Sequence, residues 1–271
     1  MLALITGAAG GLGRAMAGEC AARGYDLILT DMGGDALHHI AFGMERQYGV
    51  RVVTFPCDLT SAQGVASLLA YMDREEMYPD MLLNIAGIDF EGPFLQQNCE
   101  ALLSIVRLNI EATMRLTHGV LARRKPKQRF HIVNVSSLAS LYPIPLKATY
   151  AASKRFLLDF SIALGRELKN EGVKVLALCP GGLATTREAL LGIAAQGFWG
   201  NVTTNRLSVT AHRTISRALA GRRIYIPGAV NRVLSTLGRL VPAGLVASLL
   251  YRRWDTAQAQ WGNLEKKLGL E

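Results

Sequence analysis

Tyr150 and Lys154 are the side chains in this sequence whose types and spacing point most directly to acid–base chemistry. They stand four residues apart, so on a helix they share one face, one turn apart. An ammonium group beside a phenol favours the phenolate, and we therefore expect the pKa of Tyr150 to fall from ~10 toward neutrality. A tyrosine with such a pKa is suited to general acid or base catalysis. Because the spacing Y-x-x-x-K also recurs by chance, the assignment depends on the rest of the chain.

The N-terminal segment has the pattern of a strand, a glycine-rich turn, a helix and a second strand that ends at Asp31. Gly7, Gly11 and Gly13 allow a tight turn, close approach of the backbone to a pyrophosphate, and close packing of helix against strand. A helix that begins near Gly11 presents its N-terminus to an anion. At the end of the second strand, Asp31 is placed to accept hydrogen bonds from a ribose diol. A glycine-rich turn without a ligand is the alternative.

Seven motifs, in chain order across roughly residues 2–227, resemble those of the short-chain dehydrogenase/reductase family. They are T-G-A-A-G-G-L-G (6–13), C-D-L-T (57–60), N-I-A-G (84–87), Asn109 in R-L-N-I, V-N-V-S-S (133–137), Y-A-A-S-K (150–154) and C-P-G-G-L-A-T (179–185). The resemblance implies an α/β fold, a Rossmann-type doubly wound parallel sheet of about seven strands flanked by helices. A nicotinamide dinucleotide would bind at the carboxyl ends of the strands. N-I-A-G departs from the family's usual N-N-A-G by lacking the second Asn amide.

The resemblance also implies a catalytic tetrad of Asn109, Ser137, Tyr150 and Lys154. Ser137 precedes Tyr150 by thirteen residues, which matches the family's pair, whereas Ser136 precedes it by fourteen. By resemblance the tyrosine exchanges the proton of the substrate oxygen, the lysine lowers the tyrosine's pKa and holds the ribose, and the serine hydrogen-bonds that oxygen. Asn109 would hold a proton-relay water. A turn-forming serine and a capping or solvent-facing asparagine are the alternatives.

Further motif residues are implied to hold the cofactor. Asp58 and Leu59 would bound the adenine pocket, and Pro180, Gly181 and Thr185 would close over the nicotinamide carboxamide and the diphosphate. A loop cap and an ordinary turn are the alternatives for these two segments. The implied cofactor contacts are Gly7, Gly11, Leu12, Gly13, Asp31, Asp58, Leu59, Asn84, Ala86, Gly87, Tyr150, Lys154, Pro180, Gly181 and Thr185.

The residues around Asp31 favour NAD(H) over NADP(H). A carboxylate at this place repels a 2′-phosphate. Family members that prefer the phosphorylated cofactor usually carry a basic residue just after this strand or before the second motif glycine, where this chain has Met32 and Gly10. Arg14 is the counter-signal, but it follows the motif. NADP(H) remains the alternative.

Length and composition agree with one catalytic domain, residues 1–228, followed by a helical C-terminal extension, residues 229–271. Half of the 271 residues are hydrophobic and 19% are charged, enough for a large core. Four unpaired cysteines and five histidines without metal-ligand spacing predict buried reduced thiols and no metal site. The first strand starts at residue 2, which leaves no room for a signal peptide, so we expect a cytoplasmic protein.

Apolar residues between 138 and 145, together with a 186–206 loop that contains Phe198 and Trp199, predict a hydrophobic pocket. We expect a hydrophobic alcohol, ketone or aldehyde as substrate, interconverted by hydride transfer. A reductase of 3-oxoacyl groups on acyl carrier protein is one alternative. A dinucleotide sensor without turnover is another, but it predicts a damaged tetrad.

The segment 222–253 carries six arginines and no acidic residue, and its apolar run is broken at Arg239 and Pro242. It fails the test for a membrane-spanning helix. Packing over the substrate cleft or against a neighbouring subunit, or peripheral membrane contact through 229–253, would each account for it.

A net charge of +9 would attract polyanions without specificity, but no nucleic-acid motif accompanies it, so we expect no nucleic-acid partner. Related enzymes pair through the helices that correspond to 98–122 and 149–170, which implies a homodimer or homotetramer.

Overall fold

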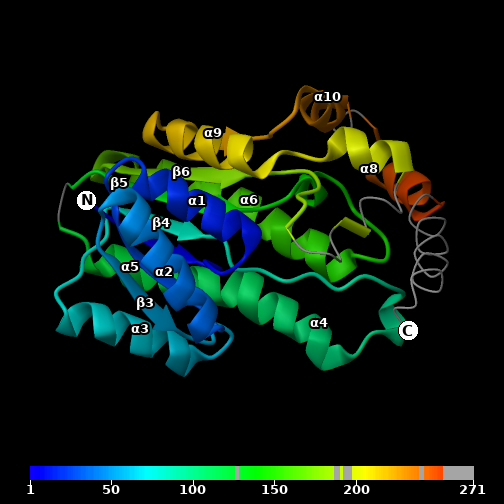
Figure 1. Ribbon diagram of the computed structural model, residues 1–271. Helices are drawn as coiled ribbons and strands as arrows, with labels where there is room; N and C mark the ends of the chain where they lie inside the picture. The colour runs from blue at the N-terminus through cyan, green and yellow to red at the C-terminus, as the bar shows by residue number, and fades with distance from the viewer. Residues whose placement is uncertain (126–127, 186–189, 192–196, 238–240, 253–271) are drawn as a thin grey trace.

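A seven-stranded parallel sheet with helices on both faces forms the protein (Figure 1). The computed structural model describes residues 1–125, 128–185, 190–191, 197–237 and 241–252. The strand order is β3-β2-β1-β4-β5-β6-β7, and every neighbouring pair is parallel. The strands are β1 (Leu2–Thr6), β2 (Asp26–Asp31), β3 (Val52–Pro56), β4 (Met81–Asn84), β5 (Phe130–Val135), β6 (Val173–Leu178) and β7 (Ile224–Tyr225). The predicted doubly wound fold is confirmed.

The order of strands reverses between β1 and β4, where the chain crosses from one half of the sheet to the other. Crevices for ligands form at the carboxyl ends of strands at such a switch point. Every residue of β4 and β5 is buried, because helices cover both faces of the sheet. Short apolar runs at the positions of these strands are therefore what the fold requires.

Successive residues of each strand point to opposite faces and enter two separate cores. On one face, Leu29 packs in a cluster with residues of α1 (Gly11–Ala21), α2 (Gly34–Tyr48) and α9 (Leu207–Leu219). On the other face, Ile28 packs in a cluster with residues of α3 (Ala62–Arg74), α5 (Thr113–Arg123) and α6 (Ala148–Glu167).

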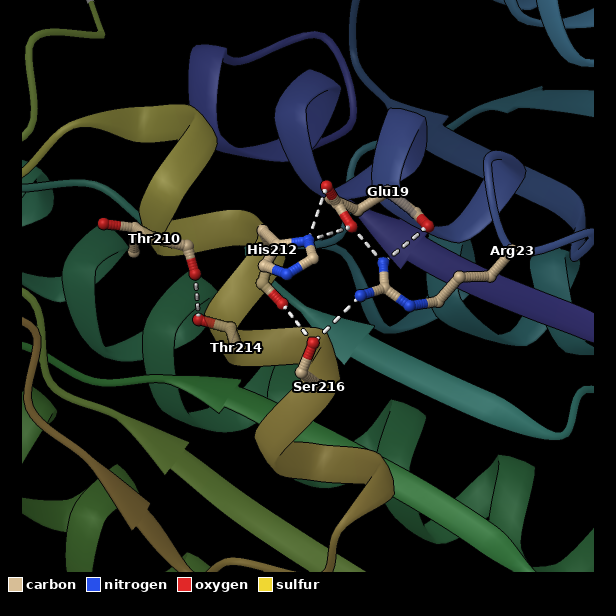
Figure 2. Close-up of polar contacts among 6 residues, drawn as sticks. All are labelled: Glu19, Arg23, Thr210, His212, Thr214 and Ser216. Atoms are coloured by element: carbon tan, nitrogen blue, oxygen red, sulfur yellow. Dashed lines mark hydrogen bonds and ion pairs between the residues drawn. The ribbon is translucent and has the colours of Figure 1, made fainter.

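A polar cluster joins α1 to α9, two helices that are far apart in the sequence but run side by side in Figure 1 (Figure 2). Arg23, which follows the C-terminus of α1, donates hydrogen bonds to Glu19 of α1 and, at 2.9 Å, to Ser216 of α9. His212 Nδ1 lies 3.3 Å from both carboxylate oxygens of Glu19. These polar contacts lie beside the buried apolar residues between the two helices and hold α9 against α1.

The long helix predicted over 98–122 is interrupted. It consists of α4 (Cys99–Ile105), a π-helical turn η2 (Val106–Ala112) and then α5. Asn98 caps α4 by accepting hydrogen bonds from the backbone N–H groups of Glu100 and Ala101. The side chains of Cys20, Cys57 and Cys179 are buried, but the prediction that all four cysteines are buried was wrong for Cys99, which is exposed in the first turn of α4.

The described residues after β6 contain mostly helices. They form α8 (Gly197–Thr203), α9, β7, α10 (Ala229–Leu237) and a further helix over the described residues 243–252. Short 3₁₀ turns are η1 (Phe94–Gln96), η3 (Leu138–Leu141) and η4 (Leu168–Glu171). Within the described ranges, every helix is too short or too polar to span a bilayer. Arg239 and Arg253 lie outside the described residues.

Candidate active site

A cavity of about 1050 Å³ opens at the carboxyl ends of the central strands. Typical small-molecule sites enclose ~300–1,000 Å³, so this one has room for a dinucleotide together with a substrate. We call its wall at the ends of β1 and β2 the glycine end, formed by residues 7–13 and Asp31. We call another part of the wall the apolar end, formed by Ile144, Leu234, Val246 and Leu250.

The glycine end is a backbone structure. Gly7 has φ of +64°, and a Cβ there would lie 2.8 Å from the backbone nitrogen of Ala86, so no other residue fits. A Cβ at Gly13 would lie 2.0 Å from the carbonyl oxygen of Gly7. Thr6 Oγ1 accepts hydrogen bonds from the backbone of Ile85 and Ala86, which joins the turn after β1 to the segment after β4. The loop is therefore packed against itself and against the segment after β4.

Asp31 lies in the cavity wall at the end of β2. Its two carboxylate oxygens accept hydrogen bonds from the backbone N–H groups of Ala9 (2.9 Å) and Met32 (2.8 Å). Each oxygen keeps a lone pair for a further donor, so the residue fits a ribose diol. Met32 is exposed beside it, and Arg14 is exposed on α1 but is not part of the cavity wall.

Ser137 and Tyr150 meet inside the cavity. Ser137 follows β5 and begins η3, where its hydroxyl accepts a hydrogen bond of 3.1 Å from the backbone of Ala139. A side-chain hydrogen bond also joins it to Tyr150, in the first turn of α6. Ser136 is instead buried and donates to the backbone carbonyl of Lys154 at 2.6 Å. The geometry thus distinguishes the two serines that the sequence places next to each other.

Lys154 lies one helical turn after Tyr150 and is almost fully buried. Its Nζ donates to the carbonyl oxygen of Val135 at 2.9 Å and lies 5.6 Å from the centre of the Tyr150 ring. A Cβ at Gly87 would lie 3.0 Å from this Nζ, so the glycine of N-I-A-G makes room for the lysine. Burial lowers the pKa of Lys154 to about 8, against the opposing effects of Asp89 and Cys179.

The expectation that the pKa of Tyr150 falls toward neutrality was wrong, because its pKa is raised. Burial of the phenol raises its pKa, and the nearby carboxylate of Asp89 raises it further. The hydrogen bond from Ser137 and the charge of Lys147 oppose this rise without cancelling it. The free energy lost when a phenolate is removed from water exceeds the stabilisation that it gains from the neighbouring positive charge and hydrogen bond. Tyr150 is therefore a protonated phenol near neutral pH.

Asn109 lies in the π-helical turn η2 and is fully buried beside the cavity. Its amide donates to the carbonyl of Ile88 at 3.1 Å and to Ser153 Oγ at 3.0 Å, and its side-chain oxygen accepts from the Ile88 N–H at 3.0 Å. These bonds tie the helix to the segment after β4 and to α6. Such a widened turn often marks a functional position in a helix.

Most of the residues that the resemblance implied for the cofactor lie in the cavity wall. These are Gly7, Gly11, Leu12, Gly13, Asp31, Asp58, Leu59, Ala86, Gly87, Tyr150, Lys154, Pro180, Gly181 and Thr185. Thr185 packs closely on the glycine turn, as shown by the distance of 3.2 Å between Thr185 and a Cβ built at Gly11. Asp58 also caps its own loop through hydrogen bonds from Thr60.

Asn84 lies beneath the cavity rather than in its wall. Its amide donates to Thr117 Oγ1 at 3.0 Å and to Asn134 Oδ1 at 2.8 Å. Asn134 in turn donates to Ser161 Oγ at 2.8 Å. This buried network links β4, α5, β5 and α6, and the side chain of Asn84 is occupied by it.

The apolar end includes the C-terminal segment. Leu234 of α10 and Val246 and Leu250 of the 243–252 helix line the cavity, as expected for a segment that packs over the cleft. Of the residues predicted between 138 and 145, the cavity wall includes Leu138, Tyr142 and Ile144. The side chains of Phe198 and Trp199 lie outside the described part of the chain.

Three charged residues of the cavity wall were missed by the sequence interpretation: Asp89, Glu91 and Lys147. Lys147 Nζ lies 2.5 Å from Asp89 Oδ2 and 2.9 Å from Glu91 Oε2. The position of two acids shortly after N-I-A-G was a signal for charge beside the site, but their partner is far away in the sequence.

Comparison with known proteins agrees with this geometry. Residues 1–192 match the family model described as short chain dehydrogenase. A very-long-chain 3-oxoacyl-CoA reductase of Laccaria bicolor is 32% identical over 175 residues, covering 64% of this chain and 52% of that protein. The chain thus spans about half the length of the first curated relatives it matches.

Solved structures share the fold over almost the whole chain. A short-chain dehydrogenase from Sphingobium yanoikuyae in complex with NADPH has a TM-score of 0.73 at 27% identity, covering 88% of this chain and 92% of that chain. The bulky-bulky ketone specific alcohol dehydrogenase of Comamonas testosteroni has the same TM-score and coverage at 26% identity. Sequence motifs, sheet topology and these matches agree, and the chain belongs to the short-chain dehydrogenase family of oxidoreductases.

Proposed function

We propose that this protein reduces a hydrophobic ketone or aldehyde to the alcohol, with Tyr150 as the general acid. One observation carries the proposal: Ser137, Tyr150 and Lys154 line the same cavity. The glycine end and the apolar end are parts of the wall of that cavity. A tyrosine whose pKa is raised holds its proton near neutral pH, which is the form that a general acid requires.

A nicotinamide cofactor, when bound along the glycine end, supplies the hydride. Tyr150 donates its phenolic proton to the carbonyl oxygen, and Ser137 hydrogen-bonds the same oxygen, where negative charge develops. The positive charge of Lys154 stabilises the phenolate left on Tyr150. Asn109 fixes the segment after β4 against α6, and we assign to it the relay by which a new proton reaches Tyr150.

We assign NAD(H) as the preferred cofactor. Asp31 in the cavity wall disfavours a 2′-phosphate, and Arg14 is not part of that wall. The Sphingobium relative binds NADPH, so NADP(H) is the competing choice. Steady-state rates with NADH and NADPH decide between them, and a large preference for NADPH would overturn the role given to Asp31.

Two substrate classes fit the apolar end. Bulky hydrophobic ketones match its aliphatic side chains and the name of the Comamonas enzyme. Thioesters of 3-oxoacyl chains also fit, and the name of the Laccaria relative favours them. A panel of both classes, followed by cofactor absorbance, separates the two.

The proposal is tested by Tyr150→Phe in the full chain. We expect turnover to fall by at least ~10²-fold, because the proton donor is lost, while cofactor affinity, measured by fluorescence titration, stays nearly unchanged. The control is Tyr78→Phe, since Tyr78 is not part of the cavity wall. Turnover that survives in Tyr150→Phe would refute the assignment.

We also propose peripheral contact between residues 229–252 and an anionic membrane surface. Leu245 and Leu249, one helical turn apart, are largely exposed, and Arg252 shares their side of the helix. No acidic residue occurs between 222 and 253 to oppose binding. Co-sedimentation with vesicles that contain phosphatidylserine should exceed that with pure phosphatidylcholine and should fall in the double variant Leu245→Ser, Leu249→Ser. Equal sedimentation in all cases would reject this contact.

A homo-oligomer is proposed through α4, η2 and α5, where Leu103, Val106 and Met114 leave apolar surface exposed. Light scattering after size-exclusion chromatography measures the mass. Met114→Glu should reduce it, and a monomeric parent protein would refute the proposal.

A further inference from the structure

Lys147, three residues before Tyr150, is held between two carboxylates at the wall of the cavity. Its Nζ lies 2.5 Å from Asp89 Oδ2 and 2.9 Å from Glu91 Oε2. The lysine side chain is 16% exposed, and those of Asp89 and Glu91 are 29% and 32% exposed. At such burial, an ion pair is screened less than a surface pair, so its charges act on neighbouring groups.

The backbone on both sides of this ion pair is also fixed. Leu146 has φ of +66°, a left-handed conformation that is unusual for leucine, and its carbonyl accepts a hydrogen bond of 2.9 Å from Gly92 N–H. Lys147 follows immediately and is the N-cap residue of α6, which begins at Ala148. The segment 89–92 and the residues 146–147 are therefore joined by one backbone bond and two charged contacts.

Tyr150 lies between two lysines whose surroundings differ. Lys147 Nζ is 5.7 Å and Lys154 Nζ is 5.6 Å from the centre of its ring. Lys154 is bound to a backbone carbonyl, whereas Lys147 is bound to carboxylates. Among the described residues, the groups that act on the pKa of the tyrosine and of its two lysines come from several elements. They are Asp89 and Glu91 after β4, Ser137 after β5, Lys147 at the N-cap of α6, Lys154 in α6, and Cys179 after β6.

We propose that Lys147, locked by Asp89 and Glu91, is a positioning residue that fixes the first turn of α6 and keeps a permanent positive charge beside Tyr150. The inference rests on the proposed role of Tyr150 as proton donor. It extends that role by naming Lys147 and Asp89 as the charged pair that acts on the pKa of the phenol.

The electrostatics support this reading. Burial alone would lower the pKa of Lys147, but the two carboxylates outweigh burial and raise it, so the lysine stays charged. On Tyr150 the members of the pair act in opposite directions, because Asp89 raises its pKa and Lys147 lowers it. Lys147→Met makes the charge beside the phenol more negative, whereas Asp89→Asn makes it less negative and leaves Lys147 paired with Glu91. Both variants weaken the same contacts, but they shift the pKa of Tyr150 in opposite directions.

The experiment compares Lys147→Met with Asp89→Asn in the full-length protein. The titration of Tyr150 is followed by NMR with ¹³C-labelled tyrosine, its signal assigned with Tyr150→Phe, and in parallel by the pH dependence of kcat/KM for carbonyl reduction. We expect the midpoint to move up by about one pH unit in Lys147→Met and down by a similar amount in Asp89→Asn. Lys147→Arg should restore the parent midpoint.

Arg155→Met is the matched control, because Arg155 pairs with Asp159 on the exposed side of the same helix. It should move neither readout. Shifts in the same direction in Lys147→Met and Asp89→Asn, or no shift, would overturn the proposal, since a purely structural lock predicts one direction for both. The NMR readout needs no turnover, so opposite shifts in an inactive protein would reject the proposed function while retaining the role of Lys147.

Discussion

The glycine end of the cavity is built from backbone at the ends of neighbouring strands, whereas the apolar end is built from side chains of segments far apart in the sequence. Gly7 and Gly13 belong to one short turn in which an added carbon would collide with backbone atoms. Leu234 and Leu250 reach the cavity from the C-terminal helices and are far from Ile144 in the sequence. A backbone site tolerates no change of shape, while a site of aliphatic side chains changes gradually with each substitution. We therefore expect effects of different size at the two ends.

Gly13→Ala should have the largest effect. Its Cβ would lie 2.0 Å from the carbonyl oxygen of Gly7, so the turn or α1 must shift. We expect a loss of ~1–3 kcal/mol or more in the free energy of unfolding and at least ~100-fold weaker cofactor binding. Urea denaturation and fluorescence titration measure the two effects.

Gly18→Ala is the control for this substitution on the same helix. The nearest atom to its Cβ would be 3.6 Å away, an ordinary contact. Alanine in a helix interior is favoured over glycine by ~0.5–1 kcal/mol, so this variant should gain stability. Equal free energies of unfolding and equal cofactor affinities in Gly13→Ala and Gly18→Ala would contradict the view that the backbone determines the shape of the glycine end.

Asp31→Asn should change cofactor choice without affecting the apolar end. The neutral amide loses a charge-assisted hydrogen bond, worth ~1.5–3 kcal/mol, and the repulsion of a 2′-phosphate. The ratio of kcat/KM for NADH to that for NADPH should fall by about 10- to 100-fold, with little change in the KM of the carbonyl substrate. Asp35→Asn, outside the cavity wall, should leave the ratio unchanged. A constant ratio in both variants would remove Asp31 from cofactor selection.

The pH dependence of the reaction tests the protonation state of Tyr150, which lies in the wall of the same cavity. Since burial raises the pKa of Tyr150, its proton is present at neutral pH and is lost only in alkaline solution. Carbonyl reduction should therefore be flat through neutrality and fall about tenfold per pH unit above the pKa of Tyr150. Alcohol oxidation should rise over the same range. A reduction rate that already falls below pH 7 would mean that the bound cofactor reverses the shift.

Leu250→Ser should give the smallest effect. The substrate would lose contact with a few methylene groups, each worth ~0.8 kcal/mol when fully buried, so we expect the KM of a hydrophobic ketone to rise about three- to tenfold. Cofactor affinity should not change. Leu95→Ser is the control, because Leu95 is 95% exposed. An effect on cofactor binding as large as that on KM would show that the two ends are not independent.

Features that depend on neighbours in the chain were predictable from the sequence. The strand, turn, helix and second strand at the N-terminus followed from the sequence pattern that ends at Asp31. The shared helix face of Tyr150 and Lys154 followed from their spacing, because 3.6 residues per turn fix which side chains are adjacent. The doubly wound parallel sheet of about seven strands was implied by the family resemblance and is confirmed.

Features that depend on distant partners were decided by the tertiary structure. The π-helical turn at Asn109 involves bonds to Ile88 and Ser153, at separations of 21 and 44 residues. The direction of the pKa shift of Tyr150 depends on burial and on Asp89, which no local spacing encodes. Lys147 meets Asp89 across 58 residues. Chain geometry determines which side chains share a helix face, but only packing determines how much water and which charges surround them, and those set the proton affinity of Tyr150.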